Sequence, residues 1–504
     1  GKHTIDLTAV ATRDSKVDRW DKLEGRDYEA NGNTNLGYNA LQYATTQKTT
    51  TGITRRRNAG YFARASYSFD DAYYLTASYR RDGASVFGKD NKWGNFYAFG
   101  GAYRITHEDF MKNVKFLNDL KLKLSWGRNG NQGISPYGTL SGAIIGPGGG
   151  ITYPFGNSSK PSFGIAQGNL GNSLLGWETT DSWNIGFESA WLNNRLFVNM
   201  DVYLSRTTDQ IFNRTIPSMT GFESMSSTMG EVANRGVEFS VHSVNIQNKD
   251  WRWDTNLTFW LNRNELVHLY GEDLDGDGKE DDDLGNNLFI GHSIHSIYGY
   301  KVAGIVQKDD TEYIQANGAT PGNPKYVDLD GNGTIGVEDR TILGTSDPRF
   351  KMSLSNTISW KNFELYFMLT GTFGGNGYFV GENTPAFLAG GGGGGAYSNN
   401  MYVPYWTEDR PSNKYPSASF SGDGRFKGLQ SRTFVRLQDI TLSYNFNFAK
   451  IKKIGINNLR LFLTGKNLFT ITGWENGDPE MGNTILSDTY PISTNLSLGA
   501  NISF

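Results

Sequence analysis

The feature that most constrains this chain is a two-residue alternation of apolar and polar side chains, which recurs along the sequence. From Leu196 to Leu204, every second residue is aliphatic and the residues between them are aromatic or polar. Successive side chains of a β-strand point to opposite faces, so such a segment has one apolar face and one polar face. An apolar face toward lipid and a polar face toward a watery lumen are typical of transmembrane β-barrel strands.

Other segments repeat this pattern, including Phe363 to Thr372 and Trp251 to Asn262. In the second of these, Trp251 and Trp253 lie at one end of the apolar row, where an interfacial girdle of aromatic residues is expected. The end of the chain alternates in the same way and stops on Phe504. The pattern predicts about fourteen antiparallel strands, several of them longer than the roughly 9 to 11 residues that a tilted strand needs to cross a membrane.

The connections between these segments alternate between short and long. The short ones are Asp70-Asp71, Asn193-Asn194, Gln247 to Asp250, Lys361-Asn362 and Asn447 to Gly455. The long ones are Asp21 to Arg55, Gln132 to Gly176, Thr208 to Ala233, Glu265 to Pro348, Gly374 to Gln430 and Thr470 to Asp488. Tight turns on one membrane side and long loops on the other indicate an up-and-down barrel. A short helix is expected within Ile105 to Asn118, on the short-turn side.

Two other architectures are less favoured. A large soluble β-sandwich or propeller would also alternate, but solvated strands seldom place rows of Trp and Leu outward against rows of Arg and Asp. No propeller-length repeat is visible. A membrane-spanning helix is excluded because no run of about 18 apolar residues occurs. The chain opens on an alternating segment, Thr4 to Val10, with no signal peptide, so we expect the true N-terminus to lie upstream.

Composition excludes several kinds of chemistry. The chain has no cysteine, which removes disulfides, thiolate metal sites and cysteine nucleophiles. Its net charge is -3, so the chain does not have the excess of basic residues that nucleic-acid binders need. Nucleic acid is therefore not expected as a partner. No Gly-x-Ser-x-Gly nucleophile elbow or phosphate-binding loop is present. His292 and His295 are three residues apart, which on a strand places them on opposite faces and disfavours a zinc pair. We therefore predict that the chain is not an enzyme.

One segment, from Asp328 to Asp339, carries a specific metal-binding pattern. Side-chain oxygens at positions 1, 3 and 5, a backbone carbonyl at 7 and a carboxylate at 12 give Ca²⁺ the oxygen shell it prefers, and glycine at position 6 permits the sharp turn. The candidate ligands are Asp328, Asp330, Asn332, Thr334 and Asp339. Position 12 is Asp and not the Glu of an EF-hand, as in the shorter loops of extracellular calcium modules. We expect a structural calcium ion; the alternative is an acidic Asp-Gly turn without metal.

A weaker calcium-type segment begins at Asp273 and repeats only the first half of the pattern. Position 12 is Leu284, so a carboxylate at Asp281 or Asp283 would have to close the shell. Its candidate ligands are Asp273, Asp275, Asp277 and Asp281. Both segments belong to one long loop, residues 265–349, so we expect calcium to hold an outward-facing loop together and not to take part in catalysis.

A second long loop, residues 374–430, is the best candidate for ligand contact because it is rich in aromatic rings. Such rings offer flat faces to sugar rings and peptide side chains. The candidates are Tyr378, Phe379, Tyr397, Tyr402, Tyr405 and Trp406. For Trp406 we favour packing within the loop over contact with a ligand.

Several motifs resemble those of the SusC/RagA-type TonB-linked outer-membrane transporters, and they occur in the family's order over nearly the whole chain. They are Tyr73 to Ser85 with Phe87-Gly88 and Lys92 to Gly94, Asn118 to Gly127 with Gly130 to Gln132, Trp177 to Thr180 with Asn184 to Gly186, Gly230 to Glu238, Phe434 to Leu437, and Leu463 to Phe469. Each motif is weak by itself.

The resemblance implies a 22-stranded transmembrane barrel plugged by an N-terminal domain. Residues 1–504 would then be the C-terminal part of that barrel, with the plug domain and the TonB-binding segment not in this chain and roughly eight strands missing upstream. A closed fourteen-stranded barrel is physically possible but less favoured. The implied location is the outer membrane of a Gram-negative bacterium, in contact with its lipid.

The implied function is TonB-dependent import of oligosaccharides or oligopeptides, with a SusD-like surface lipoprotein as a lid over the long loops and the TonB complex acting through the missing N-terminal part. Nothing in the residues chooses between glycan and peptide. One alternative is a passive or secretion-associated barrel without energised import. Another is a barrel hydrolase, which needs a Ser or Asp with His at the rim, and no convincing constellation of this kind is present.

Overall fold

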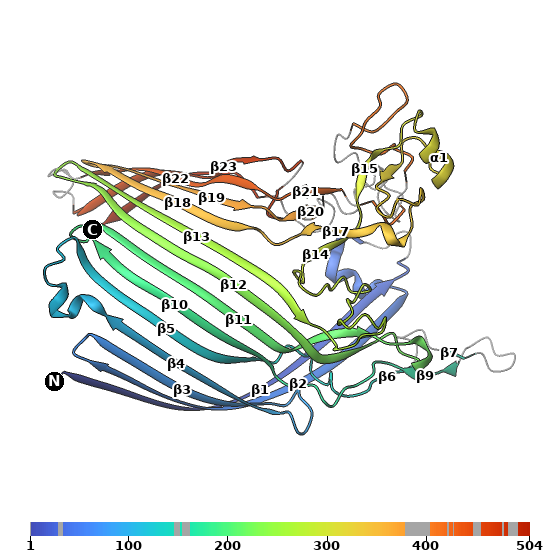
Figure 1. Ribbon diagram of the computed structural model, residues 1–504, viewed down its shortest axis with the longest axis horizontal. Coiled ribbons are helices and arrows are strands. Elements are labelled where there is room, and N and C mark those ends of the chain that lie inside the picture. The colour runs from blue at the N-terminus through green and yellow to red at the C-terminus, as the bar shows by residue number, and fades with distance from the viewer. Residues whose placement is uncertain are drawn as a thin grey trace. The chain divides into compact units, whose positions relative to one another are not determined.

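A computed structural model describes most of the chain (Figure 1). The described residues are 2–28, 34–145, 152–153, 162–378, 404–420, 423–426, 428–446, 455–475, 478–481 and 492–504. Within them, no helix has the length and apolar character needed to cross a bilayer.

Fourteen strands form one sheet in which each strand between the first and the last pairs with the long strand before it and the long strand after it. These strands are β1 (His3–Arg26), β2 (Thr46–Phe69), β3 (Tyr73–Ala84), β4 (Trp93–Arg104), β5 (Leu117–Asn131), β10 (Glu178–Trp191), β11 (Leu196–Thr215), β12 (Ser224–Gln247), β13 (Trp251–His268), β18 (Phe350–Trp360), β19 (Phe363–Phe373), β22 (Phe434–Phe446), β23 (Asn458–Thr472) and β24 (Asn495–Ser503). The sheet is antiparallel at the pairs whose registers are defined. The predicted number of strands and their up-and-down order are confirmed.

Short elements occupy the long connections. Small two-stranded sheets pair β6 (Ala143–Ile145) with β9 (Ile165–Gln167), β7 (Thr152–Tyr153) with β8 (Ser162–Phe163), β14 (Ser296–Tyr300) with β17 (Arg340–Thr345), β15 (Val302–Ile305) with β16 (Pro324–Tyr326), and β20 (Asn376–Tyr378) with β21 (Leu429–Ser431). The helical elements are α1 (Thr311–Asn317) and the 3-10 segments η1 (Thr34–Tyr43), η2 (Ile105–His107), η3 (Asp109–Met111), η5 (Ser218–Thr220) and η6 (Val337–Asp339).

The chain forms two compact units. The first comprises Gly1–Ala102, Ser125–Trp183 and Ser205–Val232, and the second comprises Tyr103–Leu124, Asn184–Leu204 and Ala233–Phe504. The second unit contains the paired strands from β13 to β24 and the two long loops predicted at 265–349 and 374–430.

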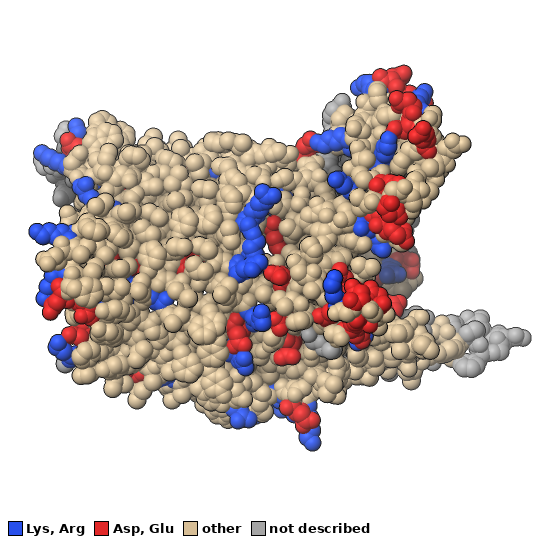
Figure 2. All heavy atoms as spheres, in the orientation of Figure 1, with Lys and Arg blue, Asp and Glu red and all other residues tan. Residues whose placement is uncertain are grey.

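One face of the sheet in the second unit is apolar, as the alternation predicts. Cross-strand pairing places leucines side by side: Leu442 of β22 lies opposite Leu365 and Leu463, and Leu463 lies opposite Leu498 of β24. Leu498 is 82% exposed, and such rows are expected only where lipid covers them. Figure 2 shows a broad, nearly uncharged area over the sheet, between the charged residues at the short-turn end and a column of charged residues nearer the long loops.

Aromatic residues mark the short-turn end of this apolar face. The rings of Trp251 and Trp360 stack with centroids 5.8 Å apart, and Trp360 stacks on Phe363 at 6.0 Å. Phe363 in turn contacts Tyr444 at 4.6 Å. Barrels place a girdle of aromatic residues at each of the two membrane interfaces. The row fits the girdle on the short-turn side.

The opposite face is polar and carries a hydrogen-bonded network. Thr258 and Ser353 share a hydrogen bond of 2.7 Å between their hydroxyl groups. The guanidinium of Arg460 donates to Glu364 at 2.7 Å and to Ser443 at 3.0 Å. We refer to the two sides of the sheet as the apolar face and the polar face.

The short turns use the backbone conformations that tight hairpins need. Asp70 and Asp71 both have positive φ, 52° and 51°, as required at the two central residues of a type I′ turn. Asn193 and Asn194 have φ of 57° and 60°. Aspartate and asparagine tolerate this region better than other non-glycine residues, so the turn residues recognised in the sequence close the hairpins.

Two predicted loops are shorter than expected, and their bounds were wrong. The loop predicted from Asp21 to Arg55 is reduced by β1 and β2, which continue to Arg26 and resume at Thr46. The loop predicted from Thr208 to Ala233 is likewise reduced by β11 and β12. Strand pairing continues beyond the apolar zone, where apolar residues such as Ile53 and Phe212 are scattered and no regular alternation in hydrophobicity reveals these extensions.

The short helix predicted on the short-turn side is present in the 3-10 form. The segment from Ile105 to Asn118 contains the 3-10 turns η2 and η3 and no α-helix. The α-helix of the described residues, α1, lies inside the long loop after β13 and was not predicted. It spans two turns or less, too few for hydrophobic periodicity to show.

The exposed leucine row predicts how the sheet meets lipid. Leu498→Arg, in the middle of β24, should destabilise the full-length protein folded in lipid vesicles by about 2 to 4 kcal/mol, because it places a charge in hydrocarbon. Ser497→Arg is the matched control, since the neighbouring side chain lies on the polar face. Denaturant unfolding in vesicles measures both, and equal destabilisation by the two variants would contradict the assignment of faces.

Candidate functional site

The long loop between β13 and β18 folds into a small packed body together with part of the next long loop. Its core consists of Tyr326, Phe420 and Phe426, with Tyr300, Val302 and Ile335 packed against them. Tyr326 comes from the loop predicted at 265–349, and the two phenylalanines come from the loop predicted at 374–430. The two loops therefore stabilise each other.

Polar contacts join the same two loops. The hydroxyl of Tyr326 donates to the carboxylate of Asp423 at 2.9 Å, and burial is the main reason that the pKa of this tyrosine is strongly raised. The backbone N–H of Ser417 donates to the carbonyl of Gly322 at 2.8 Å. Gly322 has φ of +90°, and a Cβ there would lie 2.6 Å from the ring of Trp406, so this close approach requires glycine.

The stronger calcium-type segment forms a compact loop around its first and last aspartates. Asp328 accepts hydrogen bonds from the backbone N–H groups of Gly331 and Gly333, both at 2.7 Å. Gly333, at the predicted turn position, has φ of +87°. Asn332 accepts from the backbone N–H and the hydroxyl of Thr334 at 2.8 and 2.7 Å. The predicted sharp turn at position 6 is present.

Asp339 closes this loop from inside. It has no exposed surface, and its carboxylate accepts from the backbone N–H groups of Leu329 at 2.6 Å and Gly336 at 2.7 Å. The N–H groups of Gly336 and Leu329 hold the pKa of Asp339 below its ordinary value. Oxygens of Asp328, Asp330 and Asp339 lie within 4.8 Å of one another, about twice the 2.3 to 2.6 Å length of a Ca²⁺–oxygen bond. The donor set fits calcium in chemistry and spacing.

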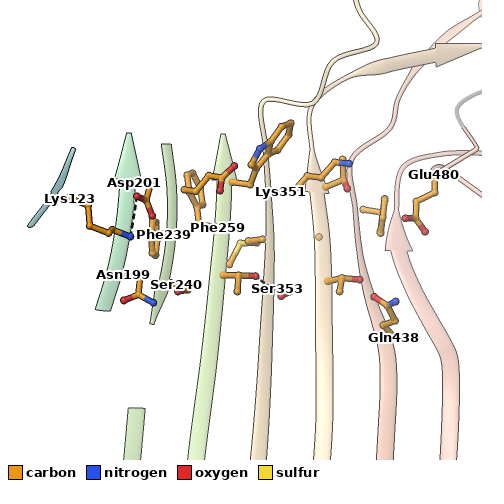
Figure 3. Close-up of a pocket in the computed structure, with 18 residues that line it drawn as sticks. Lys123, Asn199, Asp201, Phe239, Ser240, Phe259, Lys351, Ser353, Gln438 and Glu480 are labelled. Atoms are coloured by element: carbon orange, nitrogen blue, oxygen red, sulfur yellow. Dashed lines mark hydrogen bonds and ion pairs between the residues drawn. The ribbon is translucent and has the colours of Figure 1, made fainter. Parts of the chain in front are cut away.

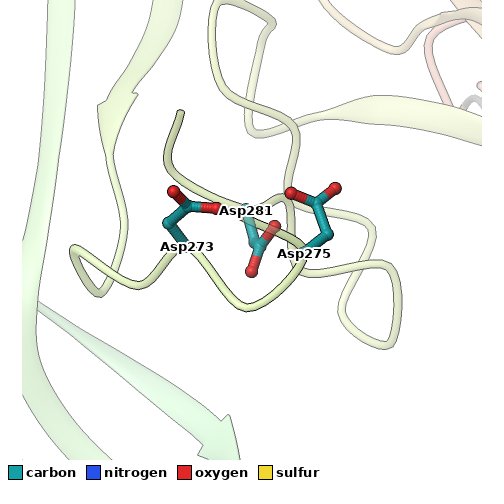
Figure 4. Close-up of side chains that lie close together, drawn as sticks. All are labelled: Asp273, Asp275 and Asp281. Carbon is teal, nitrogen blue, oxygen red and sulfur yellow. The ribbon is translucent and has the colours of Figure 1, made fainter. Parts of the chain in front are cut away.

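The weaker segment has the same construction on a shorter loop (Figure 4). Asp273 accepts from the N–H groups of Gly276 at 2.7 Å and Gly278 at 3.0 Å, as Asp328 does in the first loop. Asp281 accepts from the N–H of Leu274 at 2.6 Å and takes the place of Asp339. Oxygens of Asp273, Asp275 and Asp281 lie within 4.8 Å of one another. The predicted ligand Asp277 lies outside this group, with its carboxylate accepting from the N–H of Lys279.

The aromatic residues predicted to touch a ligand are placed unevenly. Trp406 is only 7% exposed, and its indole N–H donates to Gln307 at 2.9 Å, so its ring packs inside the loop body, in the role that the sequence favoured for it. Tyr405 is half-buried, and burial raises the pKa of its hydroxyl. The backbone of Tyr378 belongs to β20. Phe379, Tyr397 and Tyr402 lie outside the described residues.

A hollow of about 600 Å³ opens on the polar face of the second unit, at the ends of β18, β19 and β22 nearest the long loops (Figure 3). Its volume falls within the roughly 300 to 1,000 Å³ of ligand sites. One row across it consists of consecutive cross-strand partners, Trp260, Lys351, Thr372 and Phe434. The next row consists of Thr258, Ser353 and Thr370, again in register, and Thr370 pairs in turn with the buried Arg436. We call this the polar-face hollow.

The charges around the polar-face hollow come from several strands. Lys123 pairs with Glu188 at 3.1 Å and with Asp201 at 3.4 Å. Arg436 is buried, binds Asp478 at 2.7 Å and also contacts Glu480, which lines the hollow. Lys351 lies 5.7 Å from the centre of the Trp260 ring and has no carboxylate partner among the described residues. The hollow therefore combines an aromatic ring, an unpaired ammonium group and a row of hydroxyl groups.

Sequence reasoning did not identify this hollow. Alternation cannot pair β13 with β18, because a connection of more than eighty residues separates them. The signal that was available is the motif from Phe434 to Leu437, which holds both Phe434 and the buried Arg436.

Comparison with known proteins agrees with this architecture. The family model described as "TonB dependent receptor-like, beta-barrel" matches residues 3–468. TonB-dependent receptor P26 of Formosa agariphila is 31% identical over 468 residues, which cover 88% of this chain and 46% of that protein. TonB-dependent receptor SusC of Bacteroides thetaiotaomicron is 30% identical over 464 residues, which cover 90% of this chain and 44% of SusC. The chain spans about half the length of the curated relatives it matches.

Solved structures show the same relationship. The RagAB peptide importer in its closed-closed state matches with a TM-score of 0.77 and 26% identity over 100% of this chain and 54% of that chain. The structure of the RagAB peptide transporter gives a TM-score of 0.76 and 25% identity, covering 100% of this chain and 54% of that chain. These likenesses confirm the predicted fold class, an antiparallel transmembrane β-barrel, and the predicted kinship with SusC and RagA.

The environment of Asp339 predicts a pH dependence of the calcium-type loop. Because its pKa is lower in the folded loop, Asp339 stabilises the loop fully above the ordinary aspartate pKa of about 3.9 and loses this effect as the pH falls through the lower, folded value. Amide exchange should show strong protection of the Leu329 and Gly336 N–H groups at about pH 6 and much less at about pH 2.5.

In the control variant Asp339→Asn, which cannot ionise, protection should be weak at both values. Equal protection of the native loop at the two pH values would contradict the role of the carboxylate.

Proposed function

Because the chain belongs to the TonB-dependent receptor-like β-barrel family, we propose that it forms the barrel wall of a transporter that imports oligosaccharides or oligopeptides with energy supplied through TonB. The family places the protein in the outer membrane of a Gram-negative bacterium. Its relatives are receptors and transporters, which confirms the prediction that the chain is not an enzyme. Import, substrate and partners belong to this proposal because the chain spans about half of those relatives.

The observation that carries the proposal is the two-faced sheet that places a ligand-sized hollow on its polar side. The apolar face suits acyl chains, and the polar face suits a hydrated path. The polar-face hollow offers the Trp260 ring for stacking, the hydroxyl row for hydrogen bonds and Lys351 for a carboxylate or a polarised hydroxyl group. These groups suit sugar rings and peptide main chains alike, so both substrate classes stay within the proposal.

Partners are assigned by the same reasoning. We place the plug and the TonB-binding segment in the part of the relatives that this chain does not cover. We place a SusD-like lipoprotein as a lid over the long loops, whose packed body after β13 provides a rigid surface for it. Tyr378, Phe379, Tyr397, Tyr402 and Tyr405 remain the proposed aromatic contacts for a ligand at the loops.

Calcium is proposed as a structural cofactor of that packed body. The two acidic loops share one construction, and their carboxylates are close enough to share an ion. The ion would be held by Asp328, Asp330, Asn332, Thr334 and Asp339 in the first loop and by Asp273, Asp275 and Asp281 in the second. Its role would be to neutralise the clustered carboxylates and fix the loop body.

Energised import predicts a dependence on TonB. Cells that express the full-length protein together with a SusD-like lipoprotein should take up fluorescent oligosaccharides or oligopeptides, and deletion of tonB should reduce uptake to background. Trp260→Ala should lower uptake about two- to tenfold through loss of one stacking surface, whereas Trp253→Ala, on the apolar face of the same strand, should not. Uptake that persists without TonB would favour the passive barrel.

Calcium binding predicts protection of the loop from proteolysis. In the full-length protein, trypsin cleavage after Lys325 and Arg340, which flank the first loop, should be slowed by calcium at about 5 mM, above the roughly 10⁻⁴ to 10⁻³ M dissociation constants of extracellular calcium modules. Asp328→Asn with Asp330→Asn should abolish this effect, and Glu338→Gln, an exposed acid outside the group, should preserve it. Identical cleavage in calcium and in chelator would remove calcium from the account.

A further inference from the structure

The apolar face of the first unit changes character along β1 and β2. The register between these strands runs without a bulge from His3 opposite Phe69 to Arg26 opposite Thr46, so the odd-numbered residues of both strands share one face. That face begins with apolar residues near the short turn, including Ile5, Leu7, Ala63 and Ala65. It then carries four exposed arginines, Arg13, Arg19, Arg55 and Arg57, which we call the arginine patch.

The four arginines are close neighbours. Arg57 lies opposite Ser15 and Arg55 lies opposite Val17, so Arg13 is diagonal to Arg57 and Arg19 is diagonal to Arg55. Diagonal positions on antiparallel strands are about 7 to 8 Å apart, within the reach of arginine side chains. The backbone N–H groups of Arg57 and Arg55 donate to Ser85 at 2.9 Å and to Tyr137 at 3.2 Å, which holds this part of β2 where β3 has ended.

No carboxylate neutralises the arginine patch among the described residues. Three other arginines on strands of the sheet do have partners: Arg128 binds Asp181 at 2.7 Å, Arg206 binds Glu231 at 3.0 Å and Arg235 binds Glu265 at 3.3 Å. Acids that are near the patch in sequence, such as Asp14 and Asp18, occupy even positions on the polar face. Asp21 is the exception, because it lies on the face of the patch, two residues beyond Arg19. Four adjacent like charges are unfavourable without an anion to balance them.

The position of the patch identifies the anion. Tyr61, on the same face of β2, stacks on Trp93 with centroids 6.3 Å apart, and this pair fits the girdle on the long-loop side. From Phe69 at the short turn to Arg57 is twelve residues, about 41 Å along a strand. At the roughly 35 to 45° tilt of barrel strands this length rises about 29 to 33 Å, which exceeds the roughly 25 Å height of a barrel's apolar band. Arg57 and Arg55 therefore lie just beyond that band. The patch therefore lies at the headgroup level of the outer leaflet, on the side that faces lipid.

We propose that the arginine patch binds the phosphate groups of the phosphorylated glycolipid that forms the outer leaflet, with the lipid's acyl chains lying on the apolar residues of the same face. Guanidinium groups bind phosphate through paired N–H donors, and several together hold an anionic headgroup more firmly than one. The glycolipid supplies the missing counter-charge and covers β1 and β2 beyond their aromatic girdle. This inference rests on the membrane location and is independent of the transported substrate.

The test measures binding of bis-phosphorylated lipid A and of its dephosphorylated form to the delipidated full-length protein in mild detergent. The triple variant Arg13→Gln/Arg55→Gln/Arg57→Gln should weaken binding of lipid A at least about tenfold at low salt, since each charge contributes to headgroup attraction. The control Lys16→Gln/Arg56→Gln/Arg64→Gln removes the same charge from the polar face of the same strands and should bind as the native protein does. Dephosphorylated lipid A should bind the native protein as weakly as lipid A binds the patch variant.

Equal binding of the two lipid forms to the native protein would overturn the proposal, and that comparison needs no variant. Retained lipid A binding by a folded patch variant would overturn it as well. An absence of phosphate-dependent binding would mean that carboxylates of the strand on the other side of β1 already neutralise the patch, and this too would overturn the proposal. If the glutamine variant does not fold, the charge-conserving Arg13→Lys/Arg55→Lys/Arg57→Lys should retain phosphate-dependent binding. Loss of the lipoprotein partner with unchanged lipid binding would reassign the patch to a protein interface.

Discussion

Strand pairing in a medium without water is the constraint on which the rest of this structure depends. Hydrocarbon offers no partner to a backbone N–H or carbonyl group, so each strand must satisfy these groups through its neighbours. The fourteen-stranded antiparallel sheet does this with short turns such as Asp70-Asp71, while the side chains divide by parity into lipid-facing and water-facing sets. Leu463 beside Leu498 and Thr464 beside Ser497 show both sets on the same two strands.

Beyond the apolar zone the structure is held by different interactions. The body that follows β13 has its own small core around Tyr326, and backbone N–H groups fold its acidic loops around Asp328 and Asp339. The polar-face hollow lies at the ends of β18, β19 and β22 nearest the long loops, where the sheet ends and the loops begin. A transporter needs such a boundary, because the sheet gives a fixed wall and the loops can be shaped for a ligand and a lid.

Much of this could be predicted from the sequence, because parity is a local property. Alternation gave the faces of β13 and β19, and Asp-Gly spacing gave the calcium-type turns at Gly333. Properties that depend on distant pairing could not be predicted. The register that brings Lys351 beside Trp260 crosses a long loop, and the extension of β2 to Thr46 shows no regular alternation of apolar residues. Parity alone places Arg55 and Arg57 on one face of β2 and Arg56 on the other, but only the register with β1 brings Arg13 and Arg19 beside them.

The central claim is that side chains of each strand alternate between lipid and water. Its most direct test is a spin-label accessibility scan along β22 in the full-length protein reconstituted in vesicles, measured by electron paramagnetic resonance. The chain has no cysteine, so single cysteines from Phe434 to Phe446 can each carry a spin label without background from this chain. The account predicts that accessibility to oxygen dissolved in lipid and to a water-soluble nickel complex alternates with a period of two residues, in opposite phase, apart from the bulge near Leu437. Equal access of the water-soluble quencher to both faces, with no alternation, would contradict it.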